Sequence, residues 1–200
     1  MKVIFLDIDG VLNHSEYQNE IVDPKKIILL KKLVKLTNAK IVLSSSWRRK
    51  YDKDGNLVDD TSYKIIKKIL KKYDLEIYSE IENYISNEVI SNEISINEIL
   101  NSNTDDNDRA IYIVKWLNNH PEVTSFVILD DFGGWTKYNL TDHVIRTNYW
   151  DGGLKDNHIN EAINILKWNK SCYNCYGDRY EGKKNSNSNY SSNSISFFTK

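Results

Sequence analysis

The chain has 200 residues, of which 40% are hydrophobic, and its formal net charge at pH 7 is -1. This composition is sufficient for one globular domain and excludes the strong basic field of a general nucleic-acid-binding protein. The chain lacks an apolar run of about eighteen residues, so we expect no membrane span and no membrane partner. The first apolar run is too short for a signal peptide, and two cysteines cannot build a disulfide framework. We therefore expect an intracellular, cytoplasmic protein.

Strand-like and helix-like apolar patterns alternate along the chain. Asp23 and Pro24 form an N-cap and a first-turn proline, and apolar residues then follow helical spacing as far as Leu36. Alternating strands and helices predict an α/β fold with a mostly parallel sheet and helices on both faces. We predict strands over residues 2–7, 40–44, 75–78, 124–129 and 144–146, and helices over residues 24–36, 61–73, 109–119 and 156–168.

The segments between these elements lack clear periodicity. Residues 10–23 are expected to form a loop or small flap, and residues 52–56 another loop. Residues 80–108 have two alternatives, a short helix with a disordered loop or a small insert over the site. We predict one domain over residues 1–168 and a polar, disordered tail over residues 169–200.

Two carboxylates follow the first predicted strand. Asp7 and Asp9 lie two residues apart and precede Gly10, which indicates a buried strand that ends in a sharp turn. Side chains at this spacing point to the same side, and two carboxylates about 4 Å apart repel by about 4 kcal/mol at an effective dielectric near ~20. A cation or a shared proton relieves such repulsion. The pair therefore indicates a metal-assisted active site at the carboxyl edge of the sheet.

The segment from Asp7 to Val11 resembles the first motif of the haloacid dehalogenase (HAD) superfamily, hydrolases that mostly remove phosphate. The other motifs of that superfamily follow in order. An apolar run ends in Ser44, Arg109 begins a predicted helix, and a second apolar run ends in the acids Asp130 and Asp131. The string Ser-Ser-Ser-Trp-Arg at 44–48 and the Trp-Leu pair at 116–117 are similar to the HAD domain of Swiss Army Knife RNA-repair proteins.

This resemblance implies a three-layer, Rossmann-like HAD core with little or no cap. It also implies a role for each motif residue. Asp7 is the expected nucleophile, which forms an aspartyl-phosphate, and Asp9 is the expected general acid and then general base. Ser44 is expected to donate a hydrogen bond to a phosphoryl oxygen. Arg109 stands where the family more often has Lys, and it is expected to neutralise the phosphoryl charge.

The resemblance also implies a magnesium site. Its expected ligands are the side chains of Asp7 and Asp131 and the backbone carbonyl of Asp9, and Asp130 is expected to orient its neighbours. These oxygen donors suit Mg²⁺, whereas zinc would require His or Cys. Taken without the first motif, the pair of acids at 130–131 is as readily a turn that ends a strand.

Further residues are candidate substrate contacts. Ser45 offers another hydroxyl donor. Arg48 is a candidate contact for phosphate or nucleic acid, although a solvated surface arginine is the more ordinary interpretation. Trp135 either stacks on a base or packs in the core, and the core is favoured. His14, in the flap, is expected on the surface rather than against substrate.

Other candidate residues carry weaker expectations. Lys64 and Lys115 are poorer alternatives to Arg109. Cys172 and Cys175 have metal-binding spacing but no second pair, so we assign them no function.

The function expected from these residues is hydrolysis of a phosphomonoester. The short connections leave the site open, and by resemblance such enzymes accept bulky phosphorylated substrates, which favours a nucleotide or a nucleic-acid end. The alternative is a non-catalytic HAD-fold domain that binds phosphate or nucleic acid. The presence of both Asp7 and Asp9 argues against that alternative, because phosphate binding needs no nucleophile.

Overall fold

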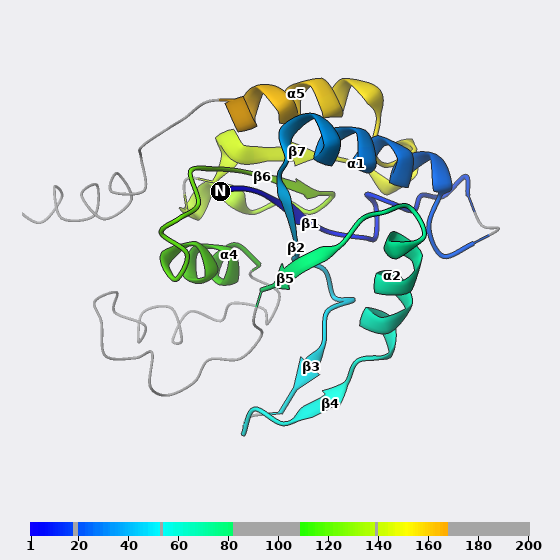
Figure 1. Ribbon diagram of the computed structural model, residues 1–200. Helices are drawn as coiled ribbons and strands as arrows, with labels where there is room; N and C mark the ends of the chain where they lie inside the picture. Colours follow the sequence, from blue (N-terminus) through cyan, green and yellow to red (C-terminus); the bar gives the residue numbers. More distant parts are fainter. Residues whose placement is uncertain (18–19, 53, 82–108, 139, 168–200) are drawn as a thin grey trace, which may run out of the picture. The chain divides into compact units, whose positions relative to one another are not determined.

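Figure 1 shows the computed structural model of the protein. It describes residues 1–17, 20–52, 54–81, 109–138 and 140–167. These ranges belong to one compact unit, Met1–Asn169. The predicted tail, the two cysteines and residues 82–108 of the uncertain insert lie outside the described residues.

Five parallel strands form the central sheet, in the order β5-β2-β1-β6-β7. This arrangement confirms the predicted α/β fold. The strands are β1 (Lys2–Leu6), β2 (Lys40–Leu43), β5 (Ile77–Glu80), β6 (Ser125–Asp130) and β7 (Val144–Arg146). β1 and β6 are apolar runs in the middle of the sheet, where both faces are covered, and every residue of β6 is buried.

Helices cover both faces of the sheet. Alternate residues of β1 point to opposite faces. Ile4 and Leu6 join the core cluster that includes Leu30 and Ile159, from helices on one face. Phe5 instead meets the ring of Trp116 edge to face, with ring centroids 5.4 Å apart, on the other face. The first face is covered by α1 (Pro24–Thr37), α2 (Thr61–Lys71) and α5 (Asp156–Lys167), and the second by α4 (Arg109–Asn118).

The first helix begins as the sequence predicts. The Asp23 side chain accepts a hydrogen bond from the Lys25 backbone N–H at 2.8 Å, and Pro24 occupies the first turn. The helix ends at Asn38, which has a left-handed φ of 54°.

The loop predicted at 52–56 connects two short strands that were not predicted, β3 (Lys50–Tyr51) and β4 (Leu57–Asp59), which pair as an antiparallel hairpin. These strands have only two and three residues and are largely exposed, so they show no burial periodicity from which to predict them. The strand expected at 75–78 is β5, two residues later, because Asp74 takes a left-handed φ of 59° after α2 and Leu75 is buried in the turn that follows.

The strand order creates a switch point between β1 and β6. From β1 the chain adds β2 and then β5 on one side, and it returns to the other side with β6 and β7. Ligands of open parallel sheets bind where the strand order reverses, at the carboxyl ends of the strands. β1 ends just before Asp7, and β6 ends at Asp130. Within the described ranges, no helix has the length and apolar character needed to cross a membrane.

Candidate active site

Three carboxylates meet at the switch point. Leu6 and Leu129 are partners in the parallel register, so the residues that follow them, Asp7 and Asp130, lie side by side. The Asp7 N–H donates to the Leu129 carbonyl at 3.0 Å, which extends the pairing by one residue. Asp131 completes the group: Asp7, Asp130 and Asp131 each offer a ligand oxygen, and these atoms lie within 4.8 Å of one another.

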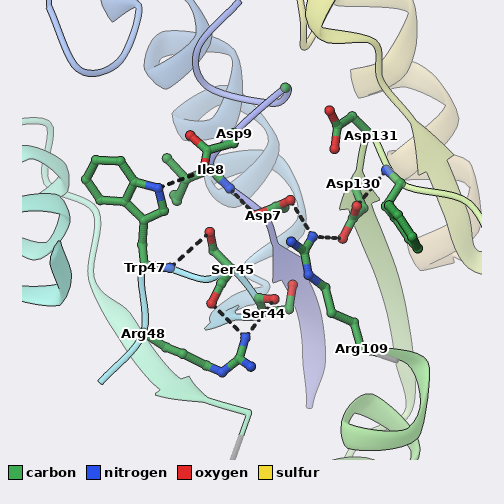
Figure 2. Close-up of polar contacts among 12 residues, drawn as sticks. Asp7, Ile8, Asp9, Ser44, Ser45, Trp47, Arg48, Arg109, Asp130 and Asp131 are labelled. Carbon is green, nitrogen blue, oxygen red and sulfur yellow. Dashed lines mark hydrogen bonds and ion pairs between the residues drawn. The ribbon is translucent and has the colours of Figure 1, made fainter. Parts of the chain in front are cut away.

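The guanidinium of Arg109 binds two of these acids. Arg109 is the first residue of α4, and its Nη1 donates to Asp7 Oδ2 and to Asp130 Oδ2, the latter at 2.6 Å. Figure 2 shows this group between the two carboxylates. The side chains of both acids are almost completely buried, and that of Arg109 is 21% exposed. A buried carboxylate requires such a partner, because water cannot stabilise its charge.

Burial dominates the protonation of the three acids. Burial, and after it the charge of Asp7, raise the pKa of Asp130 to about 6 against the opposing effect of Arg109. Burial likewise raises the pKa of Asp7, while Arg109 and a hydrogen bond from the Ser45 hydroxyl lower it. The pKa of Asp131 is also raised, first by burial and then by Asp7. One guanidinium therefore only partly compensates three neighbouring carboxylates.

Asp9 lies in different surroundings from Asp7. Its side chain is exposed, and its oxygens accept hydrogen bonds from neutral donors, Asn13 Nδ2 at 2.8 Å and Trp47 Nε1 at 2.9 Å. The Gly10 N–H donates to Asn13 Oδ1 at 2.9 Å, which fixes the orientation of that amide. The side chain of Asp9 is not part of the group of three carboxylates.

The segment after β2 forms a second wall of the site. The Ser44 N–H donates to the Leu6 carbonyl at 2.9 Å, which ties this segment to β1. The Ser44 hydroxyl is buried and has no hydrogen-bond partner among the described residues. A buried hydroxyl without a partner is costly, and a bound phosphoryl oxygen would satisfy it.

Arg48 is buried, so the expectation of a solvated surface arginine was wrong. Its side chain is 8% exposed, and Nη1 donates to the carbonyl oxygens of Ser44 and Ser45 at 3.3 and 2.7 Å. Burial and the positive charge of Arg109 lower the pKa of Arg48 to about 10. The next arginine, Arg49, binds Glu80 at the end of β5. Both arginines thus hold the loop that follows β2 in place.

The group at the switch point fits a divalent cation. Asp7, Asp130 and Asp131 supply only oxygen donors, which Mg²⁺ prefers, and their uncompensated charge favours a cation. The prediction assigned Asp130 a supporting role, whereas the structure places it within the cluster itself. Asp9 is expected to contribute its backbone carbonyl to the metal site. Its side chain accepts hydrogen bonds from Asn13 and Trp47.

The structure decides between several alternatives left by the sequence. Trp135 is buried and its indole donates to the Phe132 carbonyl at 2.9 Å, which agrees with a core residue rather than a contact for substrate. His14 is not on the surface as predicted: it is buried, and its Nε2 lies 3.0 Å from Asp23 Oδ2. Lys64, on α2, pairs with Asp60 at the N-cap of that helix, so it does not compete with Arg109.

Two residues that were not predicted as site residues contact a predicted catalytic group. Asn13 and Trp47 hold Asp9, from the flap and from the loop after β2. The only sequence signal for either residue was the string from Ser44 to Arg48. This string is similar to a known domain and includes Trp47, but the similarity implied no role for the tryptophan.

A family model described as the HAD domain in Swiss Army Knife RNA repair proteins matches residues 3–159 of the chain. The matched segment includes all six residues expected in catalysis, metal binding or support: Asp7, Asp9, Ser44, Arg109, Asp130 and Asp131. No curated protein and no solved structure matches the chain.

Replacing Gly10 with alanine should disrupt the acidic cluster. Gly10 has a φ of +70°, and an added Cβ would lie 2.1 Å from Asp131 Oδ2. Gly55 is a matched control, because its φ is +81° but a Cβ there meets nothing within 4 Å. Both variants pay the left-handed penalty of about 1–2 kcal/mol. Urea unfolding should show an additional loss of about 1–3 kcal/mol for Gly10→Ala alone. Equal losses in the two variants would contradict the close contact.

The metal-free protein should lose stability between about pH 4 and pH 6. The pKa of Asp130 is raised from 3.8 to about 6, so the folded state holds this proton more tightly than the unfolded state does. The resulting stabilisation, on the order of 2 kcal/mol, is present below about pH 4 and is lost as the pH rises through about 6. Urea unfolding across this range should show the loss in the wild type and in the exposed control Asp74→Asn. Asp130→Asn should flatten it, and parallel curves for all three proteins would refute the assignment.

Proposed function

Because the chain belongs to the family of HAD domains found in Swiss Army Knife RNA repair proteins, we propose that it is a Mg²⁺-dependent phosphomonoesterase. The proposed reaction passes through an aspartyl-phosphate on Asp7. One observation carries the proposal: Arg109 Nη1 binds the carboxylates of Asp7 and Asp130 at the switch point of the sheet, with Asp131 within reach of both. Buried carboxylates would weaken a site that only bound phosphate, because their charges repel the ligand.

The position of Asp7 suits a nucleophile. Its Oδ1 accepts the Ile8 N–H at 2.8 Å and its Oδ2 accepts Arg109, so the carboxylate is held in one orientation at the end of a buried strand. Arg109 supplies the positive charge that brings a phosphoryl dianion to an anionic nucleophile. The unpartnered Ser44 hydroxyl is the donor proposed for a phosphoryl oxygen.

The proposed chemistry has two steps. In the first, an Asp7 oxygen forms a bond to phosphorus, the bond from phosphorus to the leaving oxygen breaks, and Asp9 gives that oxygen a proton. In the second, a water oxygen attacks the phosphorus of the aspartyl-phosphate, Asp9 takes the proton of the water, and the bond to Asp7 breaks. Inorganic phosphate leaves, and both aspartates return to their starting states.

A magnesium ion is the proposed cofactor. Asp7 and Asp131 would hold it together with the Asp9 carbonyl, and Asp130 stands close enough to bind or to orient the other ligands. When bound, Mg²⁺ supplies charge that offsets the attacking carboxylate and the transferred phosphoryl group.

The proposed substrate class is a phosphorylated nucleotide or nucleic-acid end. The printed description of the family names RNA repair, which supports this class. In addition, the described residues between Gly10 and Ser44 comprise only the flap, α1 and β2, so this connection adds no separate cap. The absence of a cap at this connection suits the end of a large substrate.

Asp7→Asn should abolish phosphatase activity. The amide cannot act as the nucleophile, so hydrolysis of para-nitrophenyl phosphate in Mg²⁺ should fall by about 10³-fold or more. Asp74→Asn makes the same substitution at an exposed position whose partner is Lys31, and it should retain wild-type activity. Rapid acid quenching of the wild type should trap phosphate on the protein in a form that hydroxylamine releases, and Asp7→Asn should trap none.

Two results would contradict this mechanism. Turnover by Asp7→Asn at near the wild-type rate would exclude the covalent intermediate. A wild-type protein that binds phosphorylated oligonucleotides but hydrolyses no phosphate in a broad panel would favour the alternative of a non-catalytic binding domain.

Magnesium should stabilise the folded protein by mass action. A ligand that binds only the folded state at about a hundred times its Kd raises the free energy of unfolding by about 2.7 kcal/mol. Thermal unfolding should therefore show a Tm that rises with Mg²⁺ concentration in the wild type and much less in Asp131→Asn. Asp151→Asn, an exposed acid paired with Lys155, is the matched control and should respond as the wild type does. An equal response in all three proteins would place the ion elsewhere.

A further inference from the structure

Trp47 contacts the side chain proposed as the general acid. It lies in the loop after β2, and its indole Nε1 donates to Asp9 Oδ2 at 2.9 Å, a contact drawn in Figure 2. Its ring is half-buried and packs against the hydrophobic core. The donor is therefore fixed by the fold, whereas the acceptor belongs to an exposed side chain that would otherwise be free to change rotamer.

A second contact holds the other oxygen of Asp9. Asn13 Nδ2 donates to Asp9 Oδ1 at 2.8 Å, and the Gly10 N–H fixes Asn13 by donating to its Oδ1 at 2.9 Å. The Asp9 carboxylate is thus held from two segments that are remote in the sequence, the flap and the loop after β2. Two contacts from separate directions define the position of a carboxylate more closely than either contact alone.

The same loop also reaches the proposed nucleophile. The Trp47 N–H donates to Ser45 Oγ at 3.3 Å, and the Ser45 hydroxyl makes a hydrogen bond that lowers the pKa of Asp7. Trp47 therefore connects to Asp9 through its side chain and to Asp7 through Ser45. A displacement of this one residue would alter the spacing of both aspartates.

We propose that Trp47 is a positioning residue that aims Asp9 at the leaving oxygen, an inference that rests on the phosphatase function proposed above. An indole suits this task because it is a rigid, neutral donor. Because its ring packs against the core, this donor fixes the direction of the Asp9 carboxylate without adding a charge to the site.

The proposal predicts a dependence on the leaving group. Proton donation by a general acid contributes about 10²–10⁴ to a rate, and a misplacement of about 1 Å can cost up to about 10²-fold. An alkoxide leaving group requires that proton, whereas para-nitrophenolate leaves readily without it. Loss of the Trp47 N–H should therefore slow alkyl phosphates and leave para-nitrophenyl phosphate nearly unaffected.

The test compares kcat/KM for glycerol phosphate and para-nitrophenyl phosphate in the wild type and in Trp47→Phe. The value of kcat/KM depends only on the steps up to the formation of the aspartyl-phosphate. Activation of water by Asp9 in the second step therefore does not affect it. Trp47→Phe should lower kcat/KM for the alkyl phosphate by about 10-fold to 10²-fold and that for the aryl phosphate by less than about 3-fold. Asp9→Asn should show the same selectivity, with a larger loss.

Trp116→Phe is the matched control. It removes an indole N–H that donates to Ser79 Oγ at 3.2 Å, and it should lower the two kcat/KM values equally or not at all. Asn13→Ala removes the other donor to Asp9 without disturbing the core, and it should reproduce the selective loss even if Trp47→Phe folds poorly.

Three outcomes would overturn the proposal. An unchanged ratio in both Trp47→Phe and Asn13→Ala would show that the contacts do not position Asp9. Equal losses for the two substrates, together with a lower Tm, would show a purely structural role. If the wild type hydrolyses neither phosphate, the proposed function fails and this inference fails with it, whereas a wild type that is active while both variants match it refutes the inference alone.

Discussion

The contact of one guanidinium with two buried carboxylates is the constraint on which the site depends. Asp7 and Asp130 end adjacent parallel strands, so the register of the sheet forces them together, and burial penalises both charges. Within the described ranges, Arg109 is the only cation in an ion pair with either acid. Arg109 occupies the first turn of α4, a helix on one face of the sheet. The packing of that helix therefore determines whether the guanidinium reaches the two carboxylates. The chemistry at the sheet edge is thus coupled to the core through the rings of Trp116 and Phe5.

A second buried cation changes the electrostatic balance of the site. Arg48 makes no ion pair within the part of the chain that the structure describes, and the carbonyl oxygens of Ser44 and Ser45 replace its hydration. Its pKa is lowered to about 10 by burial and by Arg109, although the charges of Asp7 and Glu80 act in the opposite direction. A guanidinium in such a place is costly unless it serves a structural or electrostatic purpose. Here it braces the segment that carries the unpartnered Ser44 hydroxyl, and it adds positive potential where a phosphoryl group is proposed to bind.

The sequence predicted the parts of this molecule that follow from periodic burial. Long apolar runs gave the strands that end at Asp7 and Asp130, and the resemblance assigned Arg109 to the same site. The sequence did not predict the β3–β4 hairpin, whose side chains are largely exposed, or the burial of His14 and Arg48. Burial of a polar residue depends on partners supplied by the folded chain, such as Asp23 for His14, and no local pattern encodes them. The contact of Trp47 with Asp9 joins residues 38 positions apart, and it was not predicted for the same reason.

Two aspartates that stand two residues apart acquire different properties from their surroundings. Asp7 is buried against a cation and a backbone N–H, an environment that holds a charged nucleophile in one orientation. Asp9 is exposed, and its side chain accepts hydrogen bonds from two neutral donors, Asn13 and Trp47. Pairs of carboxylates whose environments differ in this way can divide a reaction into nucleophilic and acid-base roles. The backbone makes this possible, because Asp7 follows the last residue of β1 and stays buried, whereas Asp9 already lies in the turn with Gly10 and is exposed. The two residues are the same amino acid, and the difference between them therefore originates in the local backbone.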